Sequence, residues 1–444
     1  MHRTIGLKAV LALCVLMPAA CPVLGAVGAA QSQPACDETG FVPIFDGKTM
    51  TGWDVYYDAP EKEIPKPDAF VVSDGTLYCK GLGGYWLRYK ADKLDNFVLR
   101  FQYKLTKNCN SGICIHTQDR GIPWQTGFEI QLLDDYGKDP DVHANGAIYD
   151  IVPPMYNASK PLGEWNDMEI TCCGKVVKVE INGLKLIDTD FGQLTMPRGK
   201  FKTPFADLPS TGYVTFQDHG MAWWMRNVRL KKLDAKASAA CADEPKCGDE
   251  GFVTIFDGKS FDGWSVFNPE GGTVPPDNWV LQEDFVHCNG KGGGTYFRYN
   301  QPLADVVLRG EFRVAKGTNS GIVLRSAKTG EPCFTGFEVQ VFDDNGKLPN
   351  KHCCGSVYDI VTPMFNTAKP AGEWNAFEIT VDRSLVKVVL NGWKVIDTDF
   401  AKLTKPRGKF DFAYSDMPKS GYLCFQDHGG VVDYRNMRVK KIQH

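Results

Sequence analysis

The chain contains 444 residues, of which 43% are hydrophobic, and it carries a formal net charge of −3. This is globular composition, sufficient for two domains of about 200 residues that each bury a core. The near-neutral charge offers no basic surface for a phosphate backbone, so the composition argues against nucleic acid as a partner.

The N-terminus has the layout of a secretory signal peptide. A basic start precedes a short apolar run from Ala9 to Met17, and small residues follow. Such a run is too short to span a bilayer, so we expect residues 1–30 to be removed and the mature protein to be exported without a transmembrane segment. A lipid anchor at Cys21 is the less favoured alternative, because Pro18 stands where lipidation sites carry an aliphatic residue.

The chain has 15 cysteines. Export would place those of the mature protein in an oxidising compartment, where they are candidates for disulfides of unknown connectivity.

The rest of the chain contains one domain twice. Recurring motifs include GFVPIFDGKTMTGW with GFVTIFDGKSFDGW, GFEIQLLDD with GFEVQVFDD, and second occurrences of NSGI, GEWN and FQDHG. We place copy one at residues 36–233, a small and polar linker at 234–246, and copy two at 247–442. The two copies are expected to fold as separate domains.

Each copy has the pattern of antiparallel β-structure. Alternating strands flank Asn182-Gly183 in copy one and Asn391-Gly392 in copy two. An Asn-Gly pair between alternating runs is the strongest local signal for a hairpin, and long helical periodicity is absent. The sequence therefore predicts an all-β protein with two tandem jelly-roll β-sandwiches.

Strand alternation predicts a polar face on three strands of each copy. In GFEIQLLDD the large apolar residues should face the core, which leaves Glu129 and Gln131 on the other face, and Glu338 and Gln340 match them in copy two. The strand ending in FQDHG and the strand beginning with NSGI add further polar residues to this face: Gln217, His219, Asn110 and His116 in copy one, and Gln426, His428, Asn319 and Arg325 in copy two. The alternative is a sheet face that is simply solvated.

The motifs IFDGKxxxGW, NSGI, GFExQxxDD, YDIVxP, KPxGEWN, NGxKxIDTD and QDHG…RN together resemble the 3-keto-disaccharide hydrolase domain family over nearly all of both copies. The resemblance implies a concanavalin- or laminin-G-like jelly roll and metal-assisted cleavage of 3-keto-glycosides by elimination and hydration. A ketone at C3 acidifies the proton on C2, so this chemistry needs a base and a cation or donor at the enolate oxygen.

The resemblance implies roles for the residues of the polar face. In copy two it makes Glu338 and His428 base or ligands of a divalent metal ion, Asp343 a further ligand, Gln340, Gln426 and Asn319 sugar-binding residues, and Arg325 the residue that stabilises the enolate. The matching set in copy one is Glu129, His219, Asp134, Gln131, Gln217 and Asn110. Copy one has His116 where copy two has Arg325, so we expect copy two to be the more active copy.

Other interpretations stay open. Asp134 and Asp343 are equally compatible with acidic turns or a structural Ca²⁺ site. A non-catalytic pair of carbohydrate-binding modules would need aromatic platforms, for which Trp86, Trp124, Trp223 and Trp224 are candidates, and a structural envelope protein is a third possibility. The ionisable residues of the polar face favour an enzyme with a sugar or glycoside substrate. The sequence leaves the sugar, the metal and the oligomeric state undetermined.

Overall fold

The computed structural model describes residues 37–57, 68–119, 121–234, 248–271 and 277–444, together with the single positions 236 and 239. The predicted signal peptide, Cys21 and nearly all of the predicted linker lie outside these residues. Within the described part of the chain, no helix is long and apolar enough to cross a membrane.

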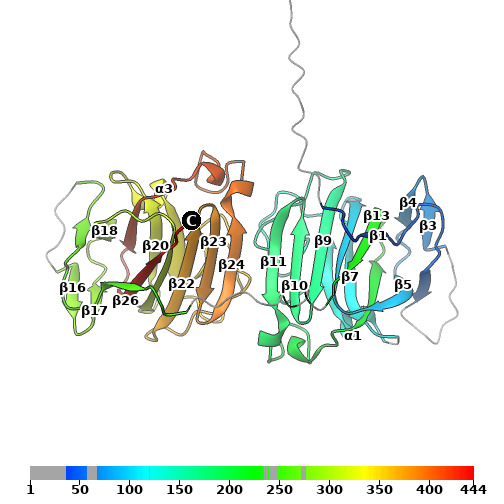
Figure 1. Ribbon diagram of the computed structural model, residues 1–444, viewed down its shortest axis with the longest axis horizontal. Coiled ribbons are helices and arrows are strands. Elements are labelled where there is room, and N and C mark those ends of the chain that lie inside the picture. The colour runs from blue at the N-terminus through cyan, green and yellow to red at the C-terminus, as the bar shows by residue number, and fades with distance from the viewer. Residues whose placement is uncertain are drawn as a thin grey trace, which may run out of the picture. The chain divides into compact units, whose positions relative to one another are not determined.

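Copy one forms a sandwich of two antiparallel sheets (Figure 1). The larger sheet has the order β11 (Leu184–Asp190), β10 (Val176–Ile181), β9 (Asn166–Cys173), β6 (Phe97–Leu105), β13 (Trp223–Lys232), β4 (Thr76–Cys79) and β3 (Phe70–Ser73), with β1 (Val42–Pro43) paired to β13. The smaller sheet has the order β2 (Trp53–Tyr57), β5 (Tyr85–Leu94), β12 (Gly212–Asp218), β7 (Asn110–Thr117) and β8 (Phe128–Leu133).

Copy two repeats this topology. Its larger sheet has the order β16 (Trp279–Gln282), β17 (Phe285–Cys288), β26 (Val432–Lys441), β19 (Val306–Val314), β22 (Asn375–Asp382), β23 (Leu385–Leu390) and β24 (Trp393–Asp399), with β14 (Val253–Phe256) paired to β26. Its smaller sheet has the order β15 (Trp264–Phe267), β18 (Thr295–Tyr299), β25 (Tyr422–Asp427), β20 (Asn319–Ser326) and β21 (Phe337–Phe342). The prediction of two tandem all-β sandwiches is confirmed; the exact domain boundaries stay a prediction.

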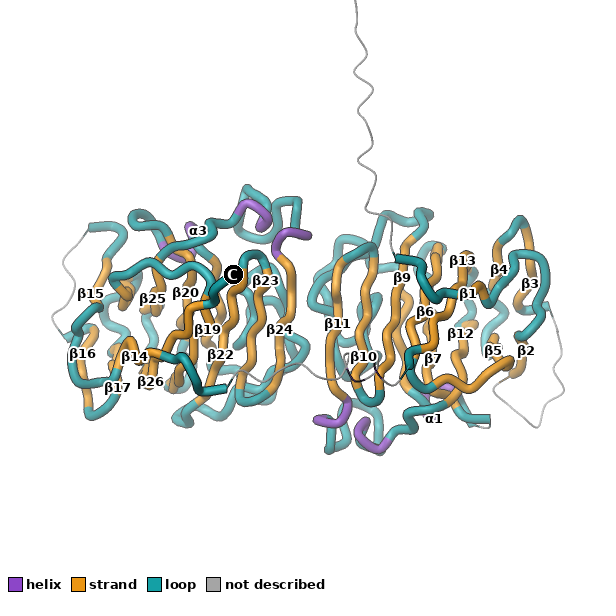
Figure 2. Tube along the Cα trace, viewed as in Figure 1, coloured by secondary structure: helices purple, strands orange, loops and turns teal. Residues whose placement is uncertain are grey.

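The helices of the described residues are short turns that lie in connections between strands (Figure 2). They include α1 (Pro123–Thr126), α3 (Pro332–Thr335), and the 3₁₀ turns η1 (Phe191–Gln193), η2 (Phe205–Asp207), η3 (Phe400–Lys402) and η4 (Tyr414–Asp416).

The two predicted Asn-Gly hairpins are present. Asn182-Gly183 joins β10 to β11 and Asn391-Gly392 joins β23 to β24. All four residues have positive φ, at 52° and 79° in copy one and 51° and 82° in copy two, as a type I′ turn requires. The local signal in the sequence therefore fixed these hairpins correctly.

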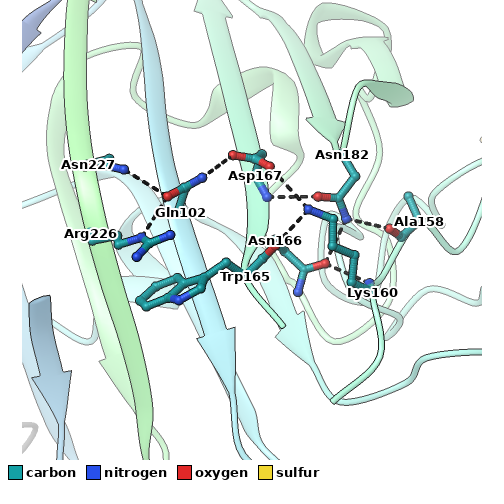
Figure 3. Close-up of polar contacts among 9 residues, drawn as sticks. All are labelled: Gln102, Ala158, Lys160, Trp165, Asn166, Asp167, Asn182, Arg226 and Asn227. Atoms are coloured by element: carbon teal, nitrogen blue, oxygen red, sulfur yellow. Dashed lines mark hydrogen bonds and ion pairs between the residues drawn. The ribbon is translucent and has the colours of Figure 1, made fainter. Parts of the chain in front are cut away.

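The side chain of Asn182 also anchors the hairpin to its neighbours (Figure 3). Its amide nitrogen donates to the carbonyl of Ala158 and to Oδ1 of Asn166, both at 2.8 Å, and its Oδ1 accepts from the backbone N–H of Asp167 at 2.9 Å. The amide thus donates two hydrogen bonds and accepts one within the protein, and these contacts hold the turn in one register.

The core lies between the two sheets of each copy. Along β6, alternate residues from Phe97 to Leu105 are buried while the residues between them are partly exposed. Burying each large apolar side chain stabilises the fold by about 1.5–3 kcal/mol, so the period of two fixes which face of the strand points inward.

The disulfide expectation is not supported for the cysteines of the core. Free buried thiols are present at Cys79, Cys109, Cys288, Cys333, Cys353, Cys354 and Cys424. These side chains pack as small apolar groups, and burial raises the pKa of the Cys109 and Cys424 thiols to about 12.

Candidate active site

The smaller sheet of copy two borders a cavity of about 670 Å³. Its lining includes Asn319 of β20, Glu338 and Gln340 of β21, Gln426 of β25, and His428 just after β25. Strand alternation thus brings polar residues from three strands to one place. The sequence predicted convergence of Glu338, Gln340, Gln426 and His428 together with Arg325, and Arg325 is not among the residues that line the cavity.

These polar side chains do not form a solvated sheet face. Glu338 is 5% exposed, Gln340 is 3% exposed and Gln426 is 6% exposed. Only His428 of this group is exposed. Because buried polar groups are costly unless they are hydrogen-bonded, a cluster of them beside a cavity is typical of a binding or catalytic site.

Glu338 is the central ionisable group of the cavity. Burial raises the pKa of its carboxyl group, and the charges of Lys409 and His428 oppose that rise. The ammonium Nζ of Lys409 donates to Oε2 of Glu338 at 3.1 Å. A carboxylate whose pKa is raised by burial is a stronger base than an exposed one, and the ammonium beside it can stabilise a developing negative charge.

Gly321 provides the space for the Glu338 carboxylate. The two residues lie on neighbouring strands, and a Cβ atom at Gly321 would stand 2.3 Å from Oε1 of Glu338. Any side chain at this position of the NSGI motif would therefore displace the carboxylate.

We expect Gly321→Ala to lower kcat/KM by about a hundredfold, because a displacement of about 1 Å at a reacting group has an effect of this size. The measurement is steady-state turnover together with thermal unfolding. Gly112→Ala is the matched control, since a Cβ there would stand 2.1 Å from Oε1 of Glu129 in copy one. Equal losses of turnover in both variants would mean that copy one contributes as much as copy two, which would contradict an active site in copy two alone.

Two amide oxygens in the cavity have no hydrogen-bond partner among the described residues. Gln340 donates from Nε2 to Oδ1 of Asn319 at 3.0 Å, and Gln426 donates from Nε2 to the hydroxyl of Tyr296 at 3.1 Å. Both Oε1 atoms are buried and unpaired. Leaving such an acceptor unpaired costs about 1–3 kcal/mol, so the site is prepared for a ligand with hydroxyl donors.

Arg325 does not point into the cavity. Its guanidinium donates to Oδ1 of Asp305 at 2.9 Å and to the carbonyl of Arg383 at 2.8 Å, toward the other sheet. The cause is a φ of 57° at Arg325, which interrupts the alternation of β20. The sequence argument assumed uninterrupted alternation, and the enolate-stabilising role predicted for Arg325 is therefore not supported.

The matching residue of copy one behaves in the same way. His116 has a φ of 56°, its Nε2 lies 3.2 Å from the carbonyl oxygen of Asp95, and its ring contacts Phe97 and Phe128 of the core. Burial lowers its pKa to about 4, so it is a neutral core residue at neutral pH. The difference between Arg325 and His116 therefore does not rank the two copies.

Asp343 and Asp134 each close a turn at the end of a strand. Oδ2 of Asp343 accepts from the backbone N–H of Gly317 at 2.7 Å, and Oδ2 of Asp134 accepts from that of Asn108 at 2.9 Å. Asp343 is not among the residues that line the cavity. The interpretation as acidic turns accounts for both residues.

The three predicted metal ligands therefore do not all come together, because Glu338 and His428 line the cavity but Asp343 does not. Asp343 is held in its turn, and one oxygen of Glu338 bonds to Lys409. A divalent ion held by carboxylate and imidazole needs several ligands within about 2–2.6 Å of one point. The set does not fit such an ion, and we assign no chemical step to one.

The residues of the cavity that strand alternation did not predict include Lys409, Tyr296 and Glu331. Lys409 lies in a loop, where strand alternation gives no information. A usable signal existed, because PRGKF occurs at residues 406–410 and again at 197–201. Tyr296 and Glu331 occur in copy two alone, and a search for repeated residues passes over them.

Copy one keeps only part of this arrangement. Glu129 is 5% exposed, and burial raises its pKa to about 7. Nε2 of Gln131 donates to Oδ1 of Asn110 at 3.2 Å, as in copy two. Gln217 is buried and His219 is exposed. The general plan of the polar face is therefore shared by both copies.

The tryptophans considered as sugar platforms are not exposed. Trp86 is 2% exposed and Trp223 is fully buried. Trp124 is half-buried beneath the ammonium of Lys200, which lies 4.2 Å from its ring centroid, and Trp224 stacks on Tyr78 with centroids 5.0 Å apart. None of these four tryptophans therefore offers the exposed platform that the binding-module alternative assigned to them.

Comparison with known proteins places this geometry in context. The model of the 3-keto-alpha-glucoside-1,2-lyase-like domain matches residues 40–231 and 251–440. A 3-keto-disaccharide hydrolase of Bacteroides thetaiotaomicron is 28% identical over 238 residues, covering 45% of this chain and 80% of that protein.

Two crystal structures of Parabacteroides distasonis proteins assigned as glycosyl hydrolases are also similar. One is 24% identical with a TM-score of 0.37 and covers 43% of this chain and 99% of that protein. The other is 28% identical with a TM-score of 0.38 and covers 44% of this chain and 94% of that protein. The family assignment depends on the domain match, which spans both sandwiches: the chain belongs to the 3-keto-alpha-glucoside-1,2-lyase-like domain family and carries two copies of that domain in tandem.

Proposed function

We propose that this protein cleaves 3-keto-glycosides and that the reaction takes place in the cavity of copy two. Family membership and the name of the Bacteroides relative support the substrate class. The observation that carries the proposal is the buried Glu338 carboxylate with the Lys409 ammonium 3.1 Å away.

In this proposal Glu338 is the base of an elimination. It removes the proton from C2 of the sugar, and the electron pair of that C–H bond forms the enolate of the C3 ketone. Lys409 stabilises the charge on the enolate oxygen. The enolate then re-forms the ketone, a C1–C2 double bond forms, and the bond between C1 and the glycosidic oxygen breaks.

Hydration completes the reaction. Water adds to C1 of the unsaturated ketone, and C2 recovers a proton from the protonated Glu338. The net change is one glycoside and one water converted to a free 3-keto-sugar and an alcohol. The unpaired oxygens of Gln340 and Gln426 are suited to accept hydrogen bonds from sugar hydroxyls throughout.

Export of the protein remains a prediction. Export is supported by the signal-like residues 1–30. A requirement for a divalent metal ion lacks support from the ligand set, and we expect EDTA-treated protein to retain its turnover. Metal analysis of the purified protein combined with this assay would decide the point.

The direct test is incubation of the purified protein with methyl 3-keto-glucoside and with methyl glucoside. We expect release of methanol and 3-keto-glucose from the first substrate and no change in the second, because only the ketone acidifies C2. Equal cleavage of both substrates would contradict the elimination. Saturable binding of the keto-sugar without conversion would support a carbohydrate-binding protein instead.

A further inference from the structure

Copy two has a second glutamate in its cavity, Glu331. Glu331 immediately precedes α3, is partly exposed, and accepts a short hydrogen bond from the hydroxyl of Tyr296 on β18. The same hydroxyl accepts from Nε2 of Gln426 at 3.1 Å. Tyr296 and Glu331 both line the cavity that contains Glu338. Asp359 and Asp427 also line the cavity, but Asp359 is paired with Lys351 and His352, and Asp427 accepts from Asn278 and from the backbone N–H of Gly429. Glu338 and Glu331 are the two glutamates of the cavity.

The fold does not require this second glutamate. In copy one the segment GIPWQTGFE matches GEPCFTGFE, so Ile122 stands at the position of Glu331. Likewise Trp86 stands at the position of Tyr296 in the matching strand. Both copies still form the same short helix and the same five-stranded sheet. The fold therefore does not account for the presence of Glu331 and Tyr296 in copy two, which favours a functional role for them.

A second proton-transfer group is what the reaction lacks. Glu338 handles the proton at C2, but the departing glycosidic oxygen must also gain a proton and the incoming water must lose one. These two events take place at C1, at a different point of the sugar from C2. One carboxylate cannot serve both positions in the same step.

We infer that Glu331 is the acid and base at C1, an inference that rests on the function proposed above. In the elimination, protonated Glu331 gives its proton to the glycosidic oxygen as the C1–O bond breaks, while Glu338 takes the proton from C2. In the hydration, the Glu331 carboxylate takes a proton from water as the hydroxide oxygen bonds to C1, while Glu338 returns its proton to C2. Both carboxylates end in their starting states, so the cycle balances.

Tyr296 is the positioning residue in this arrangement. Its ring is fully buried, and burial raises the pKa of its hydroxyl, so it stays a hydrogen-bond donor at all physiological pH values. It fixes one oxygen of Glu331 and leaves the other oxygen for the substrate. The influence of Glu331 on the pKa of Glu338 agrees with the two groups facing one cavity.

The test compares leaving groups. For methyl 3-keto-glucoside, whose alkoxide needs a proton to depart, we expect Glu331→Gln to lower kcat/KM by about 10²–10⁴-fold. For 4-nitrophenyl 3-keto-glucoside, whose phenolate departs unprotonated, the loss of acid assistance in the elimination should cost less than about tenfold. Release of nitrophenolate is the readout, so the later hydration does not affect it. Equal losses on both substrates would overturn the inference.

Two further variants separate this role from a structural one. Glu331→Ile introduces the residue that copy one carries there, so the fold should tolerate it, and it should reproduce the selective loss. Tyr296→Phe should also lower kcat/KM more for the methyl substrate than for the 4-nitrophenyl substrate, but by a smaller factor. A purely structural role of the pair would lower kcat/KM for both substrates equally. Glu338→Gln should lower cleavage of both substrates by about 10²–10⁴-fold. If the wild-type protein cleaves neither substrate, the proposed function is wrong. If it cleaves both substrates and the Glu331 variants cleave them equally well, this inference alone is wrong.

Discussion

Replacing Glu338 with glutamine is expected to lower turnover of a 3-keto-glycoside by about 10²–10⁴-fold, the range typical for a general base. Glutamine keeps the shape of the side chain and an oxygen that can accept a hydrogen bond from Lys409, but it cannot accept the C2 proton. The measurement is kcat/KM for methyl 3-keto-glucoside, with circular dichroism to verify folding.

Glu129→Gln is the matched substitution in copy one, and we expect it to retain most of the turnover. The reason is the composition of the two polar faces. Glu129 is as buried as Glu338, but Ile122 and Trp86 replace the acid–tyrosine pair of Glu331 and Tyr296. If Glu129→Gln is the damaging change, or if both substitutions act equally, our choice of copy two is wrong.

Replacing Lys409 with methionine should have the second-largest effect. The ammonium lies 3.1 Å from Oε2 of Glu338 and is the cation that the proposal places at the enolate oxygen. Losing one such electrostatic donor raises the barrier by about 2.7–4 kcal/mol, which is about a hundredfold to a thousandfold in rate. Lys200→Met in copy one is the control and should change turnover little.

The same variant should shift the pH dependence. Glu338 must be ionised to act as a base, so activity falls as the pH drops through its pKa, which burial raises and Lys409 lowers. Without Lys409, burial should raise the pKa of Glu338 further. The acidic limb of the kcat/KM profile should therefore move to higher pH. A profile that stays in place, or moves to lower pH, would mean that Lys409 does not act on the catalytic carboxylate.

The fold was readable from the sequence because its signals are local. Asn182-Gly183 and Asn391-Gly392 fix two hairpins through their backbone preferences alone, and alternation along the strands separates core from polar face. Alternation also placed Glu338 and Gln340 on the correct face. Within one strand, the period of two is enough to decide which side chains meet.

The rest of the site depends on geometry that no local pattern encodes. One residue with left-handed φ, Arg325, turned its side chain away from the cavity. Lys409 reaches Glu338 from a loop 71 residues away in the chain. Glu331 and Tyr296 meet across 35 residues and differ between the copies. Long-range contacts of this kind follow from the folded chain. A comparison of the two copies finds only the residues that they share, so it does not find Glu331 and Tyr296.

The central claim is that cleavage proceeds by removal of the C2 proton, and it can be tested in one measurement. Wild-type protein would be incubated with methyl 3-keto-glucoside in D₂O, and the 3-keto-glucose formed would be examined early in the reaction by NMR, against free 3-keto-glucose in the same buffer. Our account predicts deuterium at C2 in the enzymatic product, well above that control, because the proton taken by Glu338 exchanges with solvent before C2 is reprotonated. A product that keeps its original C2 proton, formed from a substrate whose deuteration at C2 does not slow the reaction, would show direct displacement at C1 and would contradict the elimination.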